Sequence, residues 1–196
     1  MARTGRRPGN ENTRELILEA ARKAFGERGY AGASIRYIAT SAGVDPALVH
    51  HYFGNKDQLF LAAMQAPMDP GVVLPRVLAG GVDGVGERLI RTLLSIWDSP
   101  AGSSLAAMIR SALQHEWMAK MVREFFLSQI VRRIIKHLDI DPAEAPGRAS
   151  LVASQVLGLA VARYMVKIEP LASLPNEVII KMVGTTVQRY LTEPLD

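Results

Sequence analysis

Cysteine is absent from the 196-residue chain. Disulfides, thiolate catalysis and cysteine zinc sites are therefore excluded, and we expect neither a metal site nor a cofactor. A chain without disulfides suits a reducing compartment, so we expect a cytoplasmic protein.

Long apolar runs and aromatic residues are also scarce. The longest apolar tract, residues 151–168, contains Ser154, Gln155, Arg163 and Lys167 and is too short and polar to span a bilayer. The N-terminus lacks the apolar segment of a signal peptide, so no membrane partner is expected. Aromatics make up 6% of the chain against 48% hydrophobic residues overall, mostly types that favour helices. No segment of useful length has the two-residue period of a strand, which predicts an all-α fold.

Positive charge is concentrated near the N-terminus. Residues 1–60 hold nine Lys/Arg and six Asp/Glu, which accounts for most of the net charge of +4. An arm containing Arg6 and Arg7 precedes the first expected helix and has no acid beside it. Such an arm can lie along phosphates or in a minor groove, although a disordered tail on a solvated surface would have the same composition.

The first expected helix begins near Asn12 or Thr13 and ends at Gly29. One apolar stripe repeats along it at helical spacing, formed by Leu16, Ile17, Ala20, Ala21, Ala24 and Phe25. It reads as a scaffold helix.

Residues 33–56 predict two short helices around a tight turn. Ser34 and Asp45 are placed to cap them, and Pro46 fits the first turn of the second. Gly43 supplies the positive φ that the turn requires. A bulky or acidic face could not approach base edges in a major groove. The second helix instead has a small, uncharged outer face formed by Ala47, His50 and His51.

At these residues the chain resembles the tetracycline-repressor-type (TetR) transcription regulators. The resemblance runs from Thr13 to Leu61 and rests on Ile17, Ala20, Phe25, Gly29, Tyr30, Ser34, Ile38, Ala39, Ala42-Gly43-Val44, Tyr52-Phe53, Lys56 and Leu59. It implies that one helix braces against phosphates while the next enters the major groove of double-stranded DNA. The contacts it implies are Ser34 to a phosphate, Arg36 to a base edge or phosphate, Pro46, Ala47 and Leu48 to bases, and His51, Tyr52 and Lys56 to the backbone.

Two positions depart from the commonest pattern of these regulators. Leu48 replaces a small polar residue, often Thr, and cannot donate a hydrogen bond. His50 replaces a usual Tyr; it can bond a phosphate or a base, and its charge can vary with pH. Two exposed histidines without a role remain an alternative. A metal pair is not expected, because adjacent helical residues point about 100° apart.

We expect a DNA-binding domain over residues 1–56 and a larger helical domain over 57–196, with about nine helices in all. A helix is expected from Lys56 to Ala66, capped by Asn55, and the resemblance implies that it links the two domains. Glycine and proline make residues 67–86 a connection with one helical turn from Val72 to Leu78. Further helices are expected over 84–97, with Asp83 as a possible cap, and over 103–113, 116–138, 148–168 and 176–191.

The last two expected helices present small and apolar residues at helical spacing. They predict a homodimer through a two-fold contact, formed by Leu151, Gln155, Gly158, Leu159, Ala162, Val178, Ile179, Met182, Val183, Thr186 and Tyr190. The alternative is that these faces are internal core.

Large, adaptable side chains in the central helices could line a pocket for a small hydrophobic effector. They are Trp97, Met108, Trp117, Met121, Phe125 and Met165. A plain core would show the same pattern.

The favoured hypothesis is therefore a dimeric repressor on a palindromic operator, modulated by a ligand. A sequence-tolerant architectural DNA binder is the alternative, although a charge of +4 is small for that role. An enzyme is not expected, because the acid–base candidates, His115 with Glu116 and His137 with Asp139 or Asp141, have no nucleophile or cofactor loop beside them.

Overall fold

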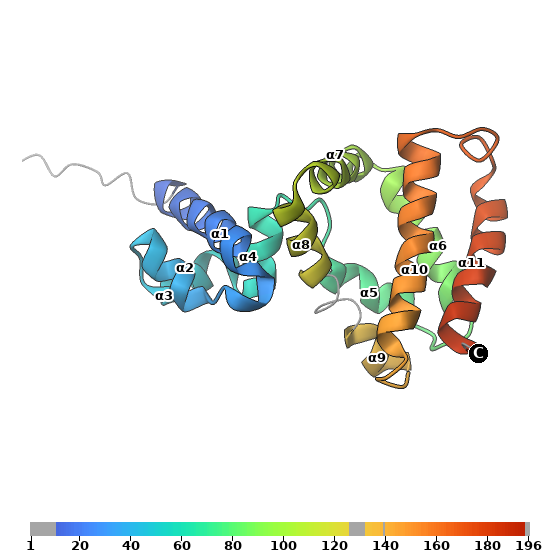
Figure 1. Cartoon of the computed structure of the whole chain (residues 1–196), viewed down its shortest axis with the longest axis horizontal. Coiled ribbons are helices and arrows are strands. Elements are labelled where there is room, and N and C mark those ends of the chain that lie inside the picture. The colour runs from blue at the N-terminus through green and yellow to red at the C-terminus, as the bar shows by residue number, and fades with distance from the viewer. Residues whose placement is uncertain (1–10, 126–131, 139, 195–196) are drawn as a thin grey trace, which may run out of the picture. The chain divides into compact units, whose positions relative to one another are not determined.

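The computed structural model describes residues 11–125, 132–138 and 140–194, and every element within these ranges is helical (Figure 1). The expected all-α fold is confirmed there. In those ranges no helix has the length and apolar character needed to cross a membrane. The chain forms two compact units: one runs to Ala66 and includes His115–Glu124, and the other comprises Pro67–Gln114 and the chain from Phe125 on.

The first unit contains α1 (Glu11–Gly32), α2 (Ile35–Ala42), α3 (Pro46–Phe53), α4 (Lys56–Ala63) and most of α8 (Glu116–Phe125). Its division differs from the expected boundary at residue 56, because α4 packs on α1 and α3. Ile17, Phe25, Ile38, Val49 and Leu59 are fully buried or nearly so, and Phe60 packs edge-on against Phe25 with ring centroids 5.1 Å apart.

Two details of α1 differ from expectation. Leu16 is 45% exposed and Leu18 is buried in its place. Gly29 does break the helix, but with φ 70° and ψ 174°, which is not a left-handed cap, and helical structure resumes to Gly32. The chain thus turns at Gly29 towards α2 without a long loop.

The second unit contains α5 (Pro70–Leu78), α6 (Val85–Trp97), α7 (Ala101–Gln114), α9 (Arg132–Leu138), α10 (Ala145–Ala160) and α11 (Asn176–Thr192). A π-helical turn, Val161–Met165, continues α10. Helices α6, α10 and α11 lie side by side (Figure 1). The backbones of α6 and α11 approach closely, since a Cβ on Gly86 would lie 2.1 Å from the Gly184 carbonyl oxygen.

Three expectations for this unit need correction or limits. Asp83 does not cap α6. Gly84 is the N-cap residue, in a left-handed conformation and without a side-chain hydrogen bond. The Arg88 guanidinium donates to the Asp83 carbonyl. The expected single turn over Val72–Leu78 is a full helix, α5, started by Asp69. The expected helix over 116–138 appears as α8 and α9, with residues 126–131 between them outside the described ranges.

Candidate nucleic-acid interface

Short polar side chains start the helices of the reader, α2 and α3. The Ser34 hydroxyl oxygen accepts from the Tyr37 N–H at 3.1 Å, and the Asp45 carboxylate accepts from the Ala47 N–H at 2.7 Å. Gly43 between them has φ 67° and ψ 31°, and a Cβ there would meet nothing within 4 Å. The turn therefore needs glycine for its backbone conformation alone, as the sequence predicted.

The reader helix α3 has a buried side and an exposed side. Val49 and Phe53 are buried, whereas Ala47, Leu48, His50 and His51 are exposed, and Pro46 and Tyr52 are partly buried. Because the Asp45 carboxylate caps the helix, the exposed side carries no acid from α3. The small, uncharged outer face expected from the sequence is thus present.

His50 is tied to the end of its own helix. Its Nδ1 lies 2.8 Å from the Gly54 carbonyl oxygen, and the Gly54 N–H donates to the His50 carbonyl at 2.8 Å. Nothing in the sequence pattern indicated this side-chain bond, because it depends on the backbone turn at Gly54.

Lys56 is folded back onto the turn between α1 and α2. Its ammonium donates to the Ala31 carbonyl at 3.3 Å and lies 4.6 Å from the centre of the Tyr30 ring. Burial lowers the pKa of Lys56, and attraction to the Asp57 and Glu124 carboxylates opposes that shift. In this conformation the ammonium is bonded to the C-terminal end of α1.

Arg28 was not among the sequence candidates. Its guanidinium carbon lies 3.7 Å from the centre of the Tyr37 ring, beside the cap of α2. A sequence pattern cannot reveal this contact, because it joins α1 to α2 through an aromatic ring.

The predicted arginine contacts have different outcomes. Arg36 is exposed on α2. Arg6 and Arg7 lie outside the described residues.

Helix α8 contributes three side chains to the first unit at helical spacing. Trp117 lies against Gly26, with Cε3 3.8 Å from the position of a Cβ there. Met121 is fully buried, and the Glu124 carboxylate accepts from the Ala31 N–H at 3.4 Å. Trp117 and Met121, which were expected to line the pocket, therefore belong to the first unit.

The other expected pocket residues lie in the second unit. Trp97, Met108 and Met165 share one apolar cluster with Leu105 and Ala160. Trp97 stacks on Tyr164 with ring centroids 5.1 Å apart. Phe125 is buried, but it is not a member of that cluster.

Tyr164 carries a polar group at the edge of this cluster. Its hydroxyl donates to Asp98 at 2.9 Å, and Asn176 donates to the same carboxylate at 2.9 Å. Burial, aided by the Asp98 hydrogen bond, raises the pKa of Tyr164 to about 12. Among the described side chains, the buried Arg163 Nε lacks a hydrogen-bond partner.

The residues expected at a dimer contact differ in exposure. Leu159 and Ile179 are buried in the chain's own core. Four are exposed on α10 and α11: Leu151, Gly158, Val178 and Met182. The remaining five, Gln155, Ala162, Val183, Thr186 and Tyr190, are partly buried. The exposed residues form the outer surface, and the buried ones support it from within.

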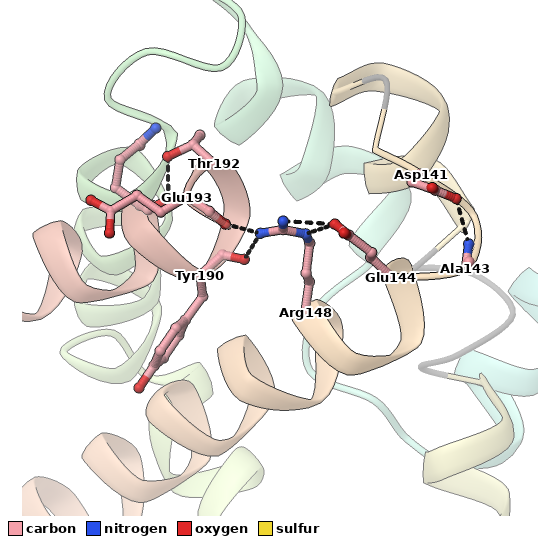
Figure 2. A network of polar contacts seen from close by, with 8 residues as sticks. Asp141, Ala143, Glu144, Arg148, Tyr190, Thr192 and Glu193 are labelled. Carbon is pink, nitrogen blue, oxygen red and sulfur yellow. Dashed lines mark hydrogen bonds and ion pairs between the residues drawn. The ribbon is translucent and has the colours of Figure 1, made fainter. Parts of the chain in front are cut away.

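Arg148 joins the start of α10 to the end of α11 (Figure 2). Its guanidinium donates to the Glu144 carboxylate at 2.7 Å and to the carbonyls of Tyr190 and Glu193, each at 2.8 Å. The residue is 7% exposed. This clasp holds in register the two helices that carry the exposed apolar residues.

Comparison with known proteins gives matches over both units. Residues 17–63 match the family described as "Bacterial regulatory proteins, tetR family", and residues 83–191 match "Tetracyclin repressor-like, C-terminal domain". A TetR-family regulator of solved structure from Streptomyces coelicolor is 38% identical, with 97% of this chain and 100% of that chain covered and a TM-score of 0.48.

Curated regulators match over shorter stretches. The HTH-type transcriptional regulator BetI of Brucella anthropi is 54% identical over 52 residues, which is 26% of this chain and 27% of BetI. The HTH-type transcriptional repressor AcnR of Corynebacterium efficiens is 44% identical over 59 residues, which is 30% of each chain. The chain thus spans less than a third of the length of these relatives.

Proposed function

We propose that this chain, which belongs to the tetR family of bacterial regulatory proteins, is a DNA-binding transcription regulator and not an enzyme. We propose further that it acts as a dimeric repressor whose binding to operator DNA is modulated by a small hydrophobic ligand. The exposed, acid-free face of α3 is the observation that supports this proposal most directly. Such a face fits the floor of a major groove.

The proposed DNA contacts come from three elements. Ser34, the N-cap of α2, has a hydroxyl that can still donate to a phosphate, and Arg36 lies on α2 itself. Lys56 is the contact from α4. The contacts from α3 are Pro46, Ala47, Leu48, His50, His51 and Tyr52. Arg6 and Arg7 of the arm complete the set. Lys56 must leave the Ala31 carbonyl to reach a phosphate, so we expect its contribution to be smaller than that of a free lysine.

Dimerisation is supported by the exposed apolar residues of α10 and α11. Met182 is 66% exposed, Val178 44% and Leu151 37%. A contact of these helices with their copies would be two-fold symmetric. Two readers about 34 Å apart would then meet a palindromic operator at successive major grooves.

The proposed ligand site is the cluster of Trp97, Met108 and Met165. Methionines adapt to irregular ligands, and the stacked Trp97–Tyr164 pair offers a flat apolar wall. The polar groups of Asp98 and Arg163 at its edge could orient a bound molecule. A ligand that binds one conformation of the second unit more tightly would change the fraction of molecules able to bind DNA.

We infer a cytoplasmic location, because chromosomal DNA is the proposed partner. Footprinting of the purified protein on the DNA upstream of its own gene tests the proposal. A protected, two-fold symmetric sequence is expected, with protection reduced by hydrophobic ligands. The architectural alternative predicts uniform protection and a steep salt dependence without sequence preference, and that result would overturn the proposal.

A further inference from the structure

His50 forms two hydrogen bonds with Gly54, one through its backbone carbonyl and one through its side chain. Gly54 donates its N–H to the His50 carbonyl and accepts from the His50 ring at its own carbonyl, both at 2.8 Å. The ring of His50 is nevertheless exposed. One edge of the imidazole is therefore fixed by the Gly54 carbonyl, in a residue that is otherwise exposed.

The turn at Gly54 explains why its carbonyl is presented to this ring. Gly54 has φ 75° and ψ −65°, and the Asn55 N–H donates to the Phe53 carbonyl at 2.8 Å, which together define a γ-turn. Continued helix would bring the Gln58 N–H to the Gly54 carbonyl, but the Asn55 side chain takes that N–H at 2.9 Å. The His50 ring therefore donates to the Gly54 carbonyl in place of the Gln58 N–H.

This bond determines the tautomer of the ring. A carbonyl oxygen only accepts hydrogen bonds, so Nδ1 of His50 must carry the proton. The neutral ring then has a bare lone pair at Nε2 and can only accept on its outer edge. A phosphate oxygen also only accepts, so it would meet Nε2 favourably only after the ring has taken up a second proton.

We propose that His50 is a proton-dependent phosphate contact: Nδ1 stays bonded to the Gly54 carbonyl, and Nε2–H of the protonated ring donates to the DNA backbone. His50 lies in the last turn of α3, whereas base edges are read mainly from the start of such helices, which favours phosphate over base. The inference rests on the proposed DNA-binding function and adds that DNA binding takes up a proton at this residue. The affinity for DNA then rises as the pH falls.

The surroundings leave the DNA as the main anionic partner for the outer edge. The other ionisable groups on α2, α3 and α4 are Arg36, Tyr37, Asp45, His51, Tyr52, Lys56 and Asp57, and Arg14 of α1 lies over the ring of Phe53. The Asp45 carboxylate accepts from the Ala47 N–H, and the Asp57 carboxylate accepts from the Tyr30 hydroxyl. Both acids in this set are thus already engaged by other groups.

The test measures the affinity of the full chain for a duplex carrying the footprinted operator, by fluorescence anisotropy at fixed ionic strength between about pH 5 and pH 8. The wild type is expected to gain about tenfold in affinity per half-site on acidification, the effect of one charge-assisted hydrogen bond. H50Q and H50Y carry donors that do not titrate in this range, so their affinity should vary far less with pH. H137Q alters a histidine of the second unit and should keep the wild-type profile.

Three outcomes would overturn the inference. The first is a pH profile that is the same in H50Q and the wild type, and the second is a profile lost in H51Q but kept in H50Q. The third comes from nitrogen NMR of the free wild-type protein, in which the neutral His50 ring should carry its proton on Nδ1. A neutral ring protonated on Nε2 would contradict the mechanism. This measurement does not depend on whether any variant folds. An absence of operator preference at every pH would instead refute the proposed function and not this step.

Discussion

The carboxylate of Glu124 lies against the backbone of Gly29, so closely that a Cβ on Gly29 would be 2.3 Å from Glu124 Oε2. The two residues are distant in sequence, and α8 brings Glu124 to the turn that joins α1 to α2. The carboxylate accepts from the Ala31 N–H, while Lys56 donates to the carbonyl of the same residue. The turn is therefore held from both sides by oppositely charged groups.

Replacement of Gly29 by alanine should destabilise the first unit for two separable reasons. With φ 70° and ψ 174° the backbone occupies a region reserved for glycine, which costs about 1–3 kcal/mol, and the methyl group also displaces Glu124. In an E124A background the second cost should disappear and the first remain. Urea unfolding of the single and double variants measures both; equal effects of G29A in the two backgrounds would show that Glu124 does not touch this turn.

Loss of the Arg148 guanidinium should destabilise the second unit strongly. R148M leaves two carbonyls without their donor and is expected to cost about 2–4 kcal/mol, with R148K intermediate because an ammonium cannot reach all three acceptors in the same geometry. The matched control is E193A, because Arg148 uses only the backbone carbonyl of Glu193. That change should have little effect on stability, because the ion pair of Glu193 with Arg189 lies at the surface and is screened by water. A similar loss in R148M and E193A would contradict the clasp.

Tyr164 should make stability fall at high pH. Burial and the Asp98 hydrogen bond raise its pKa from 10.0 to about 12 in the folded chain, so the unfolded chain ionises first as the pH rises. The stabilising contribution is complete below the unfolded pKa and is lost as the pH passes through the folded value. The urea midpoint of the wild type should fall across this pH window, and the midpoint of Y164F should fall less. The tyrosinate absorbance reports the ionisation directly. A pH profile of stability that is unchanged in Y164F would contradict the assignment.

A charge on the exposed apolar surface of α11 should separate the protomers. M182E introduces a carboxylate at a side chain that is 66% exposed in the single chain, so folding should be kept while association is lost. Sedimentation velocity should show a monomer, with weaker operator binding. L113E is the matched control, because Leu113 is 75% exposed but lies on α7. If L113E dissociated the dimer and M182E did not, the interface would include α7 and not the exposed surface of α11.

The sequence determined the local features of the reader. Ser34, Asp45, Asn55 and Gly43 act at the positions where caps and a turn were expected, because those roles depend on a residue and its neighbours within one helical turn. The apolar period likewise gave the helical class and the buried side of α3. These features need no knowledge of distant segments.

Only the tertiary structure decided which helical faces meet. Trp117 and Met121 look like pocket residues by type, but α8 places them in the first unit, and Leu159 and Ile179 are buried in the core of the second. The Arg148 clasp and the Glu124 contact depend on backbone groups brought together by folding. A periodic pattern shows that a residue is apolar or charged, but its partner is set by packing between segments far apart in the chain.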